Sequence, residues 1–239
     1  MRLAHIWPLR PACFAALLAV ALLGACARLP AEEARGTPAE SVAAQGFAQL
    51  SATGMPVGSA VAIAPDRLLT NAHVVPAGIE SLGFRRGDGA AGGTARLLAR
   101  SDRMDLAVLE IPPGLMRPVA VAEAPPEAGQ RLWALGAPSA GPAVAAGEVV
   151  RPAATLAGHG PGFTAQLGAL LGYSGGPALD GQGRLLGLVT ALPQPGAAPL
   201  LAALSGMDLD GLARGRAGRE VFLLSIEAAL AEAERIAPR

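Results

Sequence analysis

Short apolar runs, separated by Gly, Pro, Asp or Ser, dominate the chain from Val57 onward. They read VGSAVAIA, RLLT, TARLLAR, LAVLEI, QRLWALG, GEVV, RLLGLVTAL and PLLAAL. Runs of this length between turn-forming residues are typical of β-strands, and a regular series of them favours an all-β barrel or sandwich. We therefore expect an all-β domain.

A helical pattern appears at the C-terminal end. Ser225 precedes IEAALAEAERIA and is a suitable N-cap, which predicts an amphipathic helix over about 225–237. AEAPPEAG, at 122–129, is the Pro-rich break in the middle of the chain. We take it as a linker between two β-halves, a first over about 55–122 and a second over about 128–224.

The N-terminal segment has the layout of an export signal. Arg2 and Arg10 precede the uncharged run ACFAALLAVALLGA, which is shorter than the roughly 20 residues that a membrane-spanning helix needs. The run ends in LGAC, which resembles a bacterial lipobox and marks Cys26 for lipidation. The alternative is an ordinary secretory signal with an incidental Cys26. Ala27 after the cysteine favours the outer membrane.

Residues 26–45 are small, charged and Pro-containing, so we interpret them as the lipidated cysteine and a flexible tether. A short helix from Ala39 to Leu50 is the other interpretation of this region. The protein domain would then occupy 46–239.

Composition narrows the function classes. Of 239 residues, 19 are Lys or Arg and 19 are Asp or Glu, so the formal charge is zero and gives no reason to expect nucleic-acid binding. With 2 cysteines, a four-cysteine zinc site or a disulfide-rich scaffold is excluded. Hydrophobic residues make up 51%, too many for a disordered chain. We expect no metal and no cofactor.

The motif GYSGGP, at 172–177, carries the sharpest chemical signal. Glycines around a serine allow a tight turn that points N–H groups at a developing oxyanion, as a serine nucleophile requires. A glycine-rich hairpin with an exposed serine is the plainer interpretation.

A nucleophile needs a base. Of the 3 histidines, His5 lies in the signal and His159 in a Gly-rich segment that we interpret as a mobile loop. His73 is the remaining candidate.

The base needs a carboxylate that fixes its tautomer. Asp105 opens DLAVLEI, a pattern typical of a buried strand, and would lie where a turn meets the core. Asp102, in SDRMD, is the rival, which we interpret as a solvated turn residue.

The strings GSAVAIAPDRLLTNAHVV, DLAVLEI, GYSGGP and RLLGLVTAL follow one another in the order His, Asp, Ser. In these the chain resembles trypsin-like serine proteases of the chymotrypsin fold, and is most similar to the HtrA-type bacterial branch. The resemblance implies two perpendicular six-stranded β-barrels, with His73 as base, Asp105 as its orienting group and Ser174 as nucleophile. It also implies an oxyanion hole from the N–H groups of Gly172 and Ser174.

The same resemblance assigns Thr190, Ala191 and Leu192 to substrate binding, because GLVTAL matches the edge strand that pairs with the substrate backbone. Tyr173 departs from the family, which has Asp or Asn before the serine. Gly168, six residues before Ser174, does not indicate an acidic specificity pocket. The chain ends after the terminal helix, so we expect no PDZ domain.

The expected function is a serine endopeptidase of the bacterial cell envelope that works through an acyl-enzyme. Its partners would be protein or peptide substrates and, through Cys26, a membrane, with the domain in the periplasm. The alternative is a catalytically idle protease-like lipoprotein that binds or scaffolds a partner. An esterase with the same triad is a third interpretation.

Overall fold

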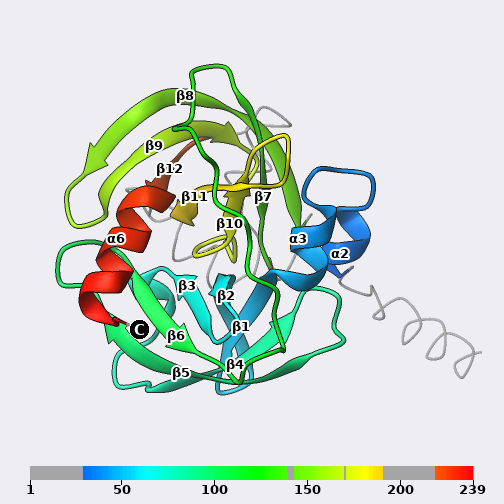
Figure 1. Ribbon diagram of the computed structural model, residues 1–239, viewed down its shortest axis with the longest axis vertical. Coiled ribbons are helices and arrows are strands. Elements are labelled where there is room, and N and C mark those ends of the chain that lie inside the picture. The colour runs from blue at the N-terminus through cyan, green and yellow to red at the C-terminus, as the bar shows by residue number, and fades with distance from the viewer. Residues whose placement is uncertain (1–28, 139–142, 170, 191–218, 239) are drawn as a thin grey trace, which may run out of the picture.

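The fold is two closed antiparallel β-barrels with a C-terminal helix, as the sequence predicted (Figure 1). This computed structural model describes residues 29–138, 143–169, 171–190 and 219–238. Cys26, Ala191 and Leu192 lie outside these residues, so lipidation at Cys26 and substrate binding at Ala191 and Leu192 stay predictions.

The first barrel begins earlier than the apolar runs suggested. Its strand order is β1-β2-β3-β6-β5-β4. The strands are β1 (Phe47–Ala52), β2 (Met55–Ala64), β3 (Arg67–Thr70), β4 (Ser81–Arg86), β5 (Gly92–Arg100) and β6 (Ala107–Glu110). The sequence predicted that the first barrel begins near residue 55, but it begins one strand earlier, at Phe47. Thr53 and Gly54 both have positive φ and form the two-residue turn that pairs β1 with β2.

The second barrel has the order β10-β11-β12-β9-β8-β7. Its strands are β7 (Arg131–Leu135), β8 (Val144–Leu156), β9 (Gly160–Leu167), β10 (Pro177–Leu179), β11 (Leu185–Thr190) and β12 (Arg219–Ser225). Each barrel has its own apolar interior, and a third buried cluster joins the two barrels. The α6 helix (Ile226–Ile236) follows Ser225 as predicted, although the Ser225 side chain makes no capping hydrogen bond.

The segment interpreted as a flexible tether is folded. Residues 30–45 form two short helices, α2 (Pro30–Glu33) and α3 (Glu40–Gln45), and the helix ends before Leu50, which lies in β1. Ala34, Ala39 and Ala43 are fully buried in the cluster between the barrels. Small side chains allow this close packing, and their weak apolar pattern is the reason that the sequence suggested a tether.

The two sets of helices lie on opposite sides of the barrel pair, α2 and α3 on one side and α6 on the other (Figure 1). Within the described residues, no helix is both long and apolar enough to cross a membrane.

Candidate active site

His73 lies directly after the end of a barrel strand. Strand β3 ends at Thr70, and a single 3-10 turn, Ala72–Val74, follows it. Val74 is buried and anchors the turn, whereas the side chain of His73 is 46% exposed. The core thus fixes the backbone of the turn and leaves the imidazole facing solvent.

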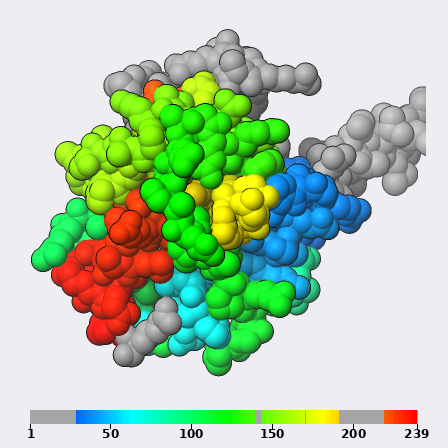
Figure 2. Space-filling view, turned by 45° about the horizontal axis from the view of Figure 1, so that its top comes forward, coloured from blue at the N-terminus to red at the C-terminus, as the bar shows by residue number. Residues whose placement is uncertain are grey.

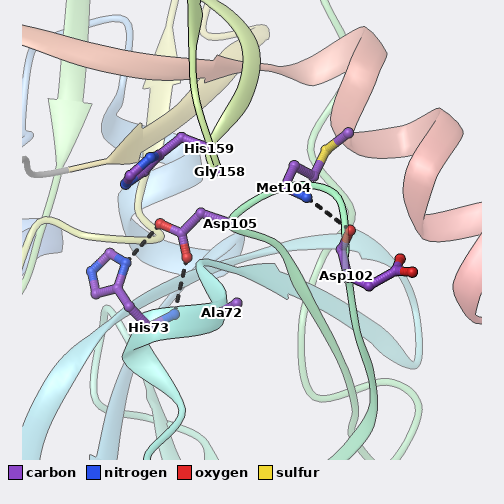
Figure 3. Close-up of a pocket in the computed structure, with 8 residues that line it drawn as sticks. Ala72, His73, Asp102, Met104, Asp105, Gly158 and His159 are labelled. Carbon is purple, nitrogen blue, oxygen red and sulfur yellow. Dashed lines mark hydrogen bonds and ion pairs between the residues drawn. The ribbon is translucent and has the colours of Figure 1, made fainter.

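Asp105 holds this histidine by two hydrogen bonds (Figure 3). The Nδ1 atom of His73 lies 2.7 Å from Oδ2 of Asp105, and the backbone N–H of His73 donates to Oδ1 at 3.0 Å. Because a carboxylate can only accept, Nδ1 carries the proton and Nε2 of the neutral ring is left as an acceptor. This is the tautomer that a general base requires.

The carboxyl group of Asp105 is nearly buried, with 8% of its side chain exposed. Burial raises its pKa, but the hydrogen bonds and charge of His73, with a smaller contribution from His159, outweigh burial and bring the pKa below its ordinary value. The group is therefore ionised at neutral pH and can stabilise a positively charged imidazole.

Asn71 ties the Asp105 backbone to the second barrel. Its fully buried amide donates to the carbonyl oxygen of Asp105 at 2.9 Å and to Oγ1 of Thr190 at 3.0 Å. Thr190 is thus placed at the site by an interaction across the barrel interface. The sequence predicted Thr190 from the resemblance but offered no partner for it.

Asp102, the rival carboxylate, faces another group. Its Oδ1 atom lies 2.7 Å from Nη2 of Arg235 on α6, and its side chain is 79% exposed. In Figure 3 the carboxylate of Asp102 points away from His73 and Asp105. The structure therefore pairs His73 with Asp105 and places Asp102 in a contact between the first barrel and the C-terminal helix.

The loop with Ser174 is packed tightly against the first barrel. A Cβ atom at Gly175 would lie 2.2 Å from Oγ1 of Thr70, 2.3 Å from the carbonyl oxygen of Ser59 and 3.1 Å from the backbone nitrogen of Asn71. Gly175 also has φ of +80°, which favours glycine. This glycine brings Ser174 beside the strand end that leads to His73.

Ser174 is 7% exposed, and its carbonyl oxygen accepts a 2.9 Å hydrogen bond from the backbone N–H of Ser59. Ser174 and His73 both belong to the described residues, and no hydrogen bond joins the serine hydroxyl to the imidazole. Catalytic hydrogen bonds often tighten only when substrate is bound. The structure thus brings Ser174, His73 and Asp105 to one site, without a hydrogen bond between the serine hydroxyl and the imidazole.

The N–H groups of Gly172 and Ser174 donate no hydrogen bond to any residue that the structure describes. The carbonyl oxygen of Gly172, in contrast, is held from both sides, by Oγ of Ser59 at 2.7 Å and by the backbone N–H of Ala137 at 3.2 Å. Gly172 has φ of +101°. Two free, fixed donors beside a serine are suited to binding an oxyanion.

Tyr173, the departure from the family pattern, is fully buried below the loop. Its ring packs on Gly136, where a Cβ atom would lie 2.4 Å from the Cγ of the tyrosine. Burial, with a contribution from the charge of Glu33, raises the pKa of Tyr173 above its ordinary value. The tyrosine is therefore a neutral, packed support for the loop.

His159 is a site residue that sequence reasoning missed. It lies in the β8–β9 turn above Asp105 and lines a cavity of about 390 Å³ together with His73, Met104 and Asp105 (Figure 3). Its ring packs edge-on against Phe222, with centroids 6.4 Å apart. In the sequence, His159 lies in a Gly-rich segment that we interpreted as a mobile loop. The barrel geometry places this segment, as the β8–β9 turn, over Asp105.

Comparisons with known proteins identify the family of this chain. A family model described as a trypsin-like peptidase domain matches residues 58–188. Serine protease Rv3671c of Mycobacterium tuberculosis is 32% identical over an alignment of 142 residues that covers 55% of this chain. The chain spans 35% of the length of that curated relative.

Among solved structures, the inactive form of the Rv3671c protease matches with a TM-score of 0.63 at 22% identity, over 84% of this chain and 93% of that chain. The HtrA-type protease AlgW with a tripeptide matches with a TM-score of 0.64 at 25% identity, over 84% of this chain and 63% of that chain. With the match over more than half of its length, the chain belongs to the family of trypsin-like peptidase domains.

Proposed function

We propose that this protein is a serine endopeptidase in which Ser174 is the nucleophile, His73 the general base and Asp105 the group that orients His73. The observation that carries the proposal is the pair of hydrogen bonds from His73 to Asp105, which leaves Nε2 of the imidazole free to accept a proton. The family match and the relatives described as serine proteases support it.

In the first half-reaction, the Oγ of Ser174 attacks the peptide carbonyl carbon while Nε2 of His73 takes its proton. The N–H groups of Gly172 and Ser174 stabilise the negative oxygen that forms. When the C–N bond breaks, His73 returns the proton to the leaving amine, and an acyl group remains on Ser174. Water then attacks this ester with the same assistance, which releases the acid and restores the serine.

The substrate class is a protein or peptide in an extended conformation. AlgW has been solved with a tripeptide and with a decapeptide, which supports peptide substrates. In this chain we assign substrate binding to Thr190, at the end of β11, and to Ala191 and Leu192, which follow it in the sequence. Gly168 adds no acidic side chain, so small or apolar side chains at the cleaved position fit best. A peptide library with all residues varied before the cleaved bond tests this preference.

The activity is tested with a fluorophosphonate probe, which forms a covalent bond with an activated serine. We expect labelling of the purified mature chain, loss of labelling in Ser174→Ala, and full labelling in Ser81→Ala, whose serine is exposed on β4. An unlabelled wild type, or labelling that survives Ser174→Ala, contradicts the proposal and favours the idle binding protein.

We propose further that Cys26 carries a lipid and holds the domain at the periplasmic face of the outer membrane. Ala27, Arg28 and Leu29 alone separate Cys26 from the start of α2 at Pro30. At about 3.5 Å per residue, the folded domain would lie within about 15 Å of the anchor. Mass spectrometry of the mature N-terminus tests this, and an unmodified Cys26 or cleavage elsewhere contradicts it.

A further inference from the structure

The N-terminal helix α2 reaches the second barrel behind the Ser174 loop. The backbone N–H of Ala143, just before β8, donates a 2.5 Å hydrogen bond to Oε2 of Glu33 at the end of α2. The two residues are 110 positions apart in the sequence. A carboxylate from the segment that precedes the first barrel therefore holds the start of β8 in the second barrel.

Three contacts connect Ala143 to the loop that carries Gly172 and Ser174. The carbonyl oxygen of Ala143 accepts a 2.9 Å hydrogen bond from the N–H of Gly136. Gly136 supports the ring of Tyr173, and the next residue, Ala137, donates its N–H to the carbonyl oxygen of Gly172 at 3.2 Å. Each step is a direct contact, so a shift of Ala143 is passed to the peptide that follows Gly172.

Glu33 also lies close to Tyr173. Its carboxylate contributes to the raised pKa of the buried phenol. Tyr173 directly precedes Ser174. The carboxylate that accepts from Ala143 is therefore near the residue that supports the loop of the nucleophile.

The helix that carries Glu33 is fixed on the domain. Ala34 and Ala39 are fully buried, and the carbonyl oxygen of Pro38 would lie 2.5 Å from a Cβ atom at Gly183 in the β10–β11 turn. Figure 2 shows this blue N-terminal segment against the yellow β10–β11 region. On the other side, the N–H of Ala31 donates to the carbonyl oxygen of Gly87 in the first barrel at 3.4 Å. A segment held by both barrels is a firm support.

We propose that Glu33 is a positioning residue for the oxyanion hole, which it holds through Ala143, Gly136 and Ala137. The inference rests on the proposed function and deepens it, because it assigns a role in the reaction to a segment outside both barrels. Preorganised donors lose effect when their support loosens. Loss of Glu33 therefore lowers kcat and leaves substrate affinity nearly unchanged.

The test compares Glu33→Ala, Glu33→Gln and the control Glu32→Ala in the purified mature chain, with kcat and KM on one peptide substrate. Glu32 is an exposed neighbour on the same helix. We expect Glu33→Ala to lower kcat and the rate of fluorophosphonate labelling about 10-fold with KM within about 2-fold, since a full oxyanion donor accounts for roughly 10²–10³. Glu33→Gln keeps an acceptor oxygen for Ala143 and recovers a large part of kcat.

Thermal unfolding and hydrogen exchange separate positioning from stability. We expect faster amide exchange within 172–176 in Glu33→Ala, at a temperature where the variant is fully folded. Unchanged kcat in folded Glu33→Ala, or an equal loss in Glu32→Ala, overturns the inference while the proposed function stands. A wild type that neither labels nor cleaves overturns both. If Glu33→Ala does not fold, Glu33→Gln decides the matter. Wild-type kcat and wild-type amide exchange in Glu33→Gln support the role of Glu33 as acceptor for Ala143. Wild-type exchange with a 10-fold lower kcat overturns that role.

Discussion

The hydroxyl group of Ser59 on β2 donates a 2.7 Å hydrogen bond to the carbonyl oxygen of Gly172 in the second barrel. The same residue donates its N–H to the carbonyl oxygen of Ser174 at 2.9 Å, and its own carbonyl oxygen accepts from Oγ1 of Thr70. Ser59 is fully buried. The first barrel therefore contributes directly to the shape of the loop that carries the nucleophile.

Ser59→Ala removes the hydroxyl but keeps both backbone contacts. The lost hydrogen bond to the Gly172 carbonyl contributes about 1 kcal/mol. If that energy stabilises the transition state, its loss lowers kcat roughly 5-fold. Steady-state kinetics measures it, and KM should stay within about 2-fold. Ser81→Ala is the matched control. A kcat equal to that of wild type would show that Ala137 alone suffices to hold the Gly172 carbonyl.

Asp105→Asn tests which carboxylate serves His73. An amide in place of the carboxylate can donate to Nδ1 and favour the wrong tautomer, a change that lowers kcat by roughly 10⁴-fold in the trypsin-type triad. Asp102→Asn breaks only the contact with Arg235, so we expect kcat within about 3-fold of wild type. Cleavage of one peptide substrate by both variants checks this, and a larger loss in Asp102→Asn would reverse the assignment.

His159→Ala tests the cavity beside the catalytic histidine. Because His159 lines this cavity beside His73 and has no assigned role in the proton transfer, its loss should weaken substrate binding and leave the chemistry intact. We expect a KM increase of about 2- to 5-fold, equivalent to about 0.5–1 kcal/mol, with kcat within about 2-fold. Kinetics on substrates that differ only in the residue before the cleaved position would show whether this cavity holds that residue. No change in KM for any of them contradicts the assignment.

Glu232 on α6 predicts a pH dependence of stability. The hydrogen bond from Arg235, opposed by burial and assisted by Ser101, lowers its pKa from 4.5 to about 2 in the folded chain. Between these values the unfolded chain binds more protons than the folded chain, so this stabilisation is complete above about pH 4.5 and is lost as the pH falls toward 2.

Glu232→Gln should therefore lower the free energy of unfolding by about 1.5–3 kcal/mol at pH 7, the usual range for hydrogen bonds to charged groups. The difference from wild type should shrink as the pH falls below 4.5. Denaturant titrations at several pH values measure it. Glu234→Gln, at an exposed position of the same helix, is the control. A difference that is constant from pH 7 to 3 contradicts the linkage.

The sequence by itself predicted the fold class, which the structure confirms, and named His73, Asp105 and Ser174 as candidates for the site. Apolar runs such as LAVLEI place strands because a short run of apolar residues between turn-forming residues is a local signal. GYSGGP, TNAHVV and DLAVLEI likewise carry their chemical signal within a few residues. The resemblance to trypsin-like serine proteases then implied that the strands form two six-stranded barrels. Asp105 could be preferred over Asp102 because it opens a buried strand.

Only the tertiary structure decided how these residues are supported. The contacts Ser59–Gly172, Asn71–Thr190 and Glu33–Ala143 each join positions about a hundred residues apart, and no local pattern records such a partner. The segment of 30–45 looked like a tether because small residues carry a weak apolar signal, yet they pack closely where two barrels meet. His159 reaches the site only because β8 and β9 form a hairpin that extends over Asp105.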